Sequence, residues 1–113
     1  MIPVEWHTSV ERAREKAKTL LENFIAVYQT NFIVTGILKE VGIERLWSLK
    51  YPYCKLKLDC VKKFDLEGKQ VSESDEETVF VNKPEFIFSK EELKNANKKV
   101  YEKACEIYGF EPS

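Results

Sequence analysis

The stretch from Leu46 to Val81 constrains the fold most, because it has the pattern of a β-hairpin. Its first arm, residues 53–60, alternates apolar and charged side chains with a period of two, as a strand with one buried face does. The apolar positions are Leu56, Leu58 and Cys60, and the charged positions are Lys55, Lys57 and Asp59. Residues 66–69 predict the turn, and residues 78–81 predict the returning strand.

Two details of the hairpin carry further expectations. Cys60 and Val61 are adjacent apolar residues, which breaks the alternation and predicts a bulge or twist. Residues 70–77 are polar and acidic without periodicity, and we expect them to form a surface loop. A short third strand is expected at residues 85–88.

An amphipathic pattern precedes the hairpin and predicts a long helix. Apolar side chains recur at three- and four-residue steps from Val10 to Tyr28, so we expect the helix to end near residues 29–31. Thr8 and Glu11 have the spacing of a capping box, which places the helix start at Thr8.

A second helix is expected at the C-terminus. Ser89 and Glu92 again have the spacing of a capping box, and an apolar stripe follows from Leu93 to Ile107. Gly109 lies where such a helix should stop.

Residues 32–50 are ambiguous because short apolar runs fit either helix or strand. Residues 32–35 are rich in β-branched side chains and favour a strand, whereas residues 35–41 slightly favour a helix that ends at Gly42. Together the patterns predict one α+β domain over residues 1–113. We expect a long N-terminal helix, a small antiparallel sheet of three to four strands, and a C-terminal helix on the same sheet face.

Composition restricts the function classes. The formal net charge is −1, so any attraction to a polyanion or polycation must be local. No apolar run approaches the roughly 20 residues of a membrane span, and no signal-peptide pattern opens the chain. Three cysteines without a plausible local pair fit a reducing compartment, and we expect a cytoplasmic location.

Charge segregates along the hairpin. Residues 45–63 hold six basic residues against one acidic residue, and residues 65–77 hold six acidic residues against one lysine. The basic block predicts a surface whose lysines neutralise phosphates while aromatic rings stack on bases. The candidate binding surface comprises Trp47, Lys50, Tyr51, Tyr53, Lys55, Lys57, Lys62 and Lys63. Alternatively, the acidic block meets a basic protein partner, or the two blocks face each other and only solvate the sheet.

A pattern at residues 37–46 admits a helix, a turn and a second helix before the hairpin. In that arrangement the chain resembles a winged-helix DNA-binding domain, which implies contacts to a nucleic acid. The corresponding wing, residues 67–77, is acidic and would repel phosphate, and Pro52 closely follows the second helix.

No motif in the sequence assigns a catalytic, cofactor-binding or metal-binding residue. His7 is the sole histidine, and the spacing of Cys54 and Cys60 is not that of a structural zinc site, so we expect the cysteines to act as buried apolar residues. We therefore expect no cofactor and a non-catalytic binding or regulatory protein, with a protein partner or a second copy. The alternatives are a nucleic-acid-binding protein that uses residues 45–63, and a small enzyme whose site assembles only in three dimensions.

Overall fold

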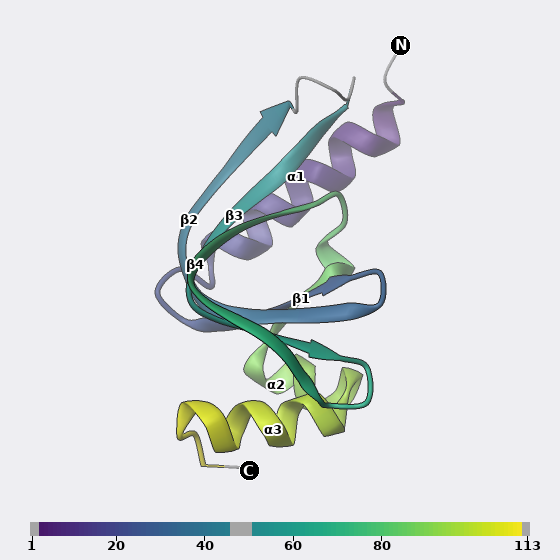
Figure 1. Ribbon diagram of the computed structural model, residues 1–113. Coiled ribbons are helices and arrows are strands. Elements are labelled where there is room, and N and C mark those ends of the chain that lie inside the picture. The colour runs from purple at the N-terminus through teal and green to yellow at the C-terminus, as the bar shows by residue number, and fades with distance from the viewer. Residues whose placement is uncertain (1–2, 46–50, 112–113) are drawn as a thin grey trace.

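The computed structural model describes residues 3–45 and 51–111, which form an α+β protein with one antiparallel sheet (Figure 1). Five strands pair in the order β4-β3-β2-β1-β5. The elements are α1 (Val4–Lys18), β1 (Phe24–Gln29), β2 (Phe32–Arg45), β3 (Pro52–Asp65), β4 (Gln70–Val81), η1 (Pro84–Phe86), β5 (Ile87–Ser89), α2 (Lys90–Ala96) and α3 (Lys98–Tyr108). The predicted α+β class is confirmed.

The central hairpin is confirmed, and it is longer than the sequence predicted. β3 and β4 pair from Cys54↔Val81 to Phe64↔Gln70, so residues 70–77 form a strand and not the expected loop. Their polar side chains lack periodicity because almost all of them are exposed, so backbone pairing with β3 defines this strand. In the turn, the Asp65 carboxylate accepts hydrogen bonds from the N–H groups of Glu67 and Lys69.

The bulge predicted at Cys60 is confirmed. Cys60 and Val61 lie opposite the single residue Gly36, and Cys60 has a φ of 55°. A Cβ atom at Gly36 would lie 2.9 Å from the Asp59 carbonyl oxygen, so only glycine allows this approach of β2 to β3. The expectation of a buried thiol is wrong for Cys60, which is exposed at the bulge.

The N-terminal helix is shorter than predicted. It begins at Val4 after Pro3 and ends at Lys18, so Thr8 lies inside the helix and caps nothing. Residues 24–27 belong to β1, which lies between two other strands. Residues 24–27 are all apolar, and such a run can continue the apolar stripe of a helix. It also suits a strand with both faces covered, and the structure forms this strand.

Residues 35–41 form part of β2, so the expected helix there is wrong. Leu38 and Val41 pack against the α1 side of the sheet, whereas Ile37 packs on the other side. The same strand covers residues 37–45, and the helix-turn-helix of a winged-helix domain is therefore not formed. Pairing with β3 along the whole of β2 outweighs the weak local preference for helix.

The helices cover opposite faces of the sheet, which corrects the expectation of one shared face. Val10, Ala13 and Ala17 of α1 pack in one core with Ile25 and Val27. The alternate residues of β1, Phe24 and Ala26, lie in a second core with α2 and α3. Figure 1 shows α1 at one end of the molecule and α3 at the other.

The predicted C-terminal helix is divided in two at Asn97. Ser89 and Glu92 form the predicted capping box of α2, and Gly109 ends α3 with a φ of 78°. Between them, the Asn97 side chain accepts a hydrogen bond from the Val100 N–H and starts α3 anew. The short strand expected at residues 85–88 is realised as η1 followed by β5.

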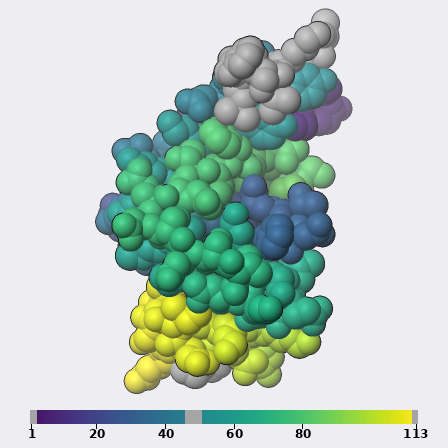
Figure 2. All heavy atoms as spheres, in the orientation of Figure 1, coloured from purple at the N-terminus to yellow at the C-terminus, as the bar shows by residue number. Residues whose placement is uncertain are grey.

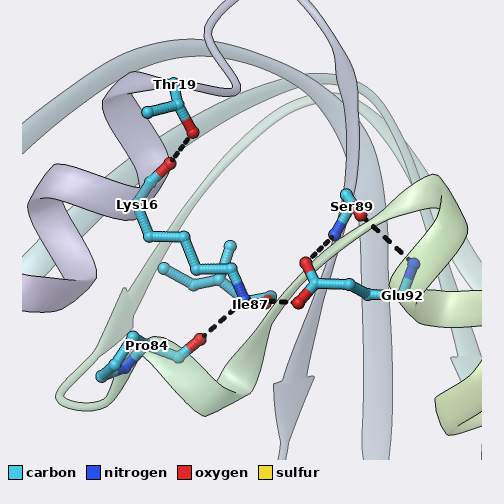
Figure 3. A network of polar contacts seen from close by, with 6 residues as sticks. All are labelled: Lys16, Thr19, Pro84, Ile87, Ser89 and Glu92. Carbon is cyan, nitrogen blue, oxygen red and sulfur yellow. Dashed lines mark hydrogen bonds and ion pairs between the residues drawn. The ribbon is translucent and has the colours of Figure 1, made fainter.

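Lys16 connects α1 with the segment that follows the sheet hairpin (Figure 3). Its ammonium donates hydrogen bonds to the Ile87 carbonyl oxygen at 2.6 Å, the Pro84 carbonyl oxygen at 3.3 Å and the Glu92 carboxylate at 3.0 Å. One charged group thus holds η1, β5 and α2 against α1.

We predict that Lys16→Met lowers the free energy of unfolding by about 1–2 kcal/mol, because the aliphatic stem remains while three acceptors lose their donor. Urea unfolding measures this loss. Lys18→Met is the control, since Lys18 makes only an exposed ion pair with Glu15 and its removal should change little. Equal losses in the two variants would contradict the role of Lys16.

Glu92 makes this network sensitive to pH. Burial acts to raise the pKa of Glu92, but hydrogen bonds from Ser89 and Lys16 outweigh it and lower the pKa below its ordinary value of 4.5. A lowered carboxyl pKa stabilises the fold above the unfolded-state pKa, and this stabilisation is lost as the pH falls through the folded-state pKa. We therefore expect the stability difference between the wild type and Glu92→Gln to shrink from neutral to acidic pH in urea titrations. A constant difference would refute the assignment.

Candidate functional site

The outer side of β4 is one of the two edges of the sheet. β4 pairs with β3 on one side, and it ends the strand order on the other. The green segment that contains β4 lies across the front of the molecule in Figure 2. Gln29 at the tip of the β1–β2 hairpin reaches this strand, where its side-chain N–H donates to the Phe80 carbonyl oxygen at 3.1 Å.

Hydrogen bonding identifies which backbone groups of β4 point away from β3. Alternate residues of an antiparallel strand direct both N–H and C=O to the same side. The contact from Gln29 places the Phe80 carbonyl on the outer side, and the period of two places Thr78 and Glu76 there as well. The Ser74 hydroxyl, 3.3 Å from the Glu76 carbonyl oxygen, agrees with this assignment.

The edge carries uncompensated negative charge. Glu73 pairs with Lys62 and Glu76 pairs with Lys57, whereas Asp75 and Glu77 make no ion pair within the described ranges. The hydrogen bond and charge of Lys62 lower the pKa of Glu73, which keeps this carboxylate ionised. The edge thus carries four acidic side chains, of which two lack a cation among the described residues.

The predicted binding surface lies along β3, and its lysines have partners. Lys55 lies 3.7 Å from Glu44, Lys57 lies 3.4 Å from Glu76, and Lys62 lies 2.7 Å from Glu73. Lys63 instead lies over the Phe32 ring, 5.9 Å from its centroid. The arrangement supports the interpretation in which the basic and acidic blocks face each other across neighbouring strands.

The aromatic members of that surface pack within the protein. Trp6 of α1 meets Tyr51 and Tyr53 edge to face at 4.8 and 5.3 Å between ring centroids. Its indole N–H donates to the Pro52 carbonyl oxygen at 2.7 Å. These contacts hold both tyrosines in place. Trp47 and Lys50 lie outside the described residues.

A cleft of about 290 Å³ separates the tip of the β1–β2 hairpin from β4. Phe32, Val34, Val79 and Phe80 give it apolar walls, and Lys63 and Glu77 bring one charge of each sign. Neither of these charges makes an ion pair with another described residue. The cleft lies beside the free part of the β4 edge, because Glu77 and Thr78 belong to both.

Burial raises the pKa of two titratable side chains, Cys54 and Tyr108. Burial raises the pKa of the Cys54 thiol to about 11, so this group stays protonated and is a poor nucleophile. Burial also raises the pKa of Tyr108 to about 12, and its hydroxyl donates to the Cys60 carbonyl oxygen at 2.6 Å. Within residues 3–45 and 51–111 no group of three His, Cys, Asp or Glu side chains could hold a metal ion.

Comparison with known proteins gives no relative from which a function could be transferred. The sequence matches no protein-family model, and no curated protein shows a significant match to it. None of the helices in the described ranges is long and apolar enough to cross a membrane.

Sequence reasoning missed the edge strand because it treated residues 70–77 as a loop. Two signals could have identified it. The segment contains neither glycine nor proline, and apolar residues recur after the break at Cys60 and Val61 as far as Phe64. A hairpin arm of that length needs a returning arm of similar length, and residues 70–77 directly follow the turn.

Because the backbone groups of Glu76 and Thr78 point away from β3, we predict that amide hydrogen exchange alternates between fast and slow along β4. We expect the amides of Glu76 and Thr78 to exchange rapidly and those of Glu77 and Val79 to exchange slowly, because only the latter donate to β3. Amide exchange followed by NMR measures this alternation. Equal protection at all four positions would show that the outer edge is already covered.

Proposed function

We propose that this chain is a non-catalytic regulatory protein that binds another protein, and that the outer edge of β4 accepts an extended basic segment of the partner as an added strand. The observation that carries the proposal is the outward-facing backbone of Glu76 and Thr78 on an edge strand with unpaired carboxylates. In strand addition, backbone hydrogen bonds supply affinity and the alternating side chains supply specificity.

Charge favours a basic partner segment. Asp75 and Glu77 lack cations among the described residues, and a lysine or arginine opposite either of them would form a new pair. Such complementarity raises the association rate and selects against acidic segments.

The same charges disfavour a second copy on this edge. Two β4 strands that paired antiparallel about Ser74 would place Glu73 of one copy opposite Asp75 of the other. Like charges directly opposite each other destabilise a strand pair. A different protein is therefore the better occupant of the edge than a homodimer.

The nucleic-acid alternative receives less support. Lys55, Lys57 and Lys62 have carboxylate partners within 4 Å. A phosphate would have to displace these carboxylates, and the nearby acidic edge would repel it.

Titration with designed peptides tests the proposal. A peptide with alternating lysine and threonine should bind and shift the amide resonances of β4, whereas its glutamate counterpart should not. Binding should weaken at about 1 M salt, where the screening length is about 3 Å. We expect Asp75→Lys combined with Glu77→Lys to reduce the affinity at least about tenfold.

The control variant is Glu102→Lys combined with Glu106→Lys, which changes the net charge equally on α3. It should retain most of the affinity for the lysine peptide. Equal weakening in both variants would show that the peptide senses only net charge. Thr78→Pro should abolish binding, because it removes an outward N–H and blocks the edge, whereas Thr78→Ala should bind as the wild type does.

A further inference from the structure

We infer that the cleft beside β4 takes one bulky apolar side chain at the leading end of the bound segment, so that the partner motif is an apolar residue followed by alternating basic residues. This inference rests on the proposed function, and it specifies the sequence that the edge recognises.

The β1–β2 hairpin determines where an added strand must begin. The Gln29 side chain donates a hydrogen bond to the Phe80 carbonyl oxygen, so a further strand cannot pair with the edge at this position. An added strand can therefore pair along Glu76 and Thr78 but must end or turn away at the hairpin. If it runs antiparallel to β4, as every pair in this sheet does, its first residue lies at the cleft.

The walls of the cleft suit an apolar side chain. Phe32 is 40% exposed although it lies in a strand, and its ring forms one wall. Phe80 of the lining is half-buried, and Val34 and Val79 are buried. The volume of about 290 Å³ lies at the low end for ligand pockets, which suits a single side chain rather than a larger ligand.

Charge separates the apolar position from the basic positions. The Lys63 ammonium and the Glu77 carboxylate both line the cleft, so their opposite charges offset each other and favour neither a cation nor an anion inside it. Asp75 lies beyond the cleft and attracts cations along the edge that follows. A neutral apolar side chain is thus favoured inside the cleft and a basic one beyond it, which commits the occupant to an apolar residue followed by basic ones.

A double-mutant cycle between peptide and protein tests this order. The probes are lysine–threonine peptides that begin with either phenylalanine or alanine, and the proteins are the wild type and Phe32→Ala. Replacing the leading phenylalanine by alanine should weaken binding to the wild type about tenfold and binding to Phe32→Ala by less than about twofold. Phe32→Leu should retain most of the preference, because it keeps an apolar wall.

Ile107→Ala on α3 is the matched control, since Ile107 is an apolar side chain of similar exposure (38%). The preference for the leading phenylalanine should be unchanged in this variant. Circular dichroism of each variant establishes that it is folded before its affinity is compared. A peptide that carries its phenylalanine at the trailing end should gain nothing over the alanine peptide.

The outcomes separate the two proposals. If the lysine peptides bind β4 but show no coupling with Phe32, the cleft inference is overturned and the proposed function stands. If neither peptide shifts the amides of β4, both fall. A concentration-dependent shift of the cleft amides without peptide would assign the cleft to a second copy of this chain and would also overturn the inference.

Discussion

The close approach of Gly36 to the bulge at Cys60 is the constraint on which the rest of the structure depends. Because two residues of β3 oppose one of β2, the side chains that follow the bulge exchange faces, so Leu58 lies in the α1 core and Phe64 in the core of α2 and α3. Figure 1 shows β2, β3 and β4 changing direction together in the middle of the molecule. One sheet can therefore support two separate cores, each closed by its own helices.

The same bend creates the candidate site. It brings β4 close enough to the β1–β2 hairpin for Gln29 to bond the Phe80 carbonyl oxygen, and it leaves the preceding part of the edge open beside a cleft. A flat sheet would keep β4 and β1 two strands apart along the whole of their length. Charged side chains on an exposed edge strand are a common device by which natural sheets oppose pairing with a second copy.

The charge segregation seen in the sequence has two consequences in the structure. Lys57 and Lys62 of the basic block neutralise Glu76 and Glu73 across the β3–β4 pair, which removes most of the reason to expect a phosphate-binding surface. Asp75 and Glu77 remain without a cation among the described residues, and the proposed binding role of the acidic edge rests on this observation. The sequence located the charged region but left open which of its charges pair with one another, because cross-strand pairing cannot be read from spacing along the chain.

By itself, the sequence determined the α+β class, the hairpin, the bulge at Cys60, the capping box at Ser89 and the stop at Gly109. Each of these leaves a signal among residues within a few positions of one another, such as a broken alternation, a capping-box spacing or a glycine stop. Only the tertiary structure decided that residues 24–27 and 35–41 are strands, that the helices cover opposite faces, and that residues 70–77 form an edge. Apolar runs such as residues 24–27 satisfy helix and strand equally well, and pairing with distant strands makes the choice.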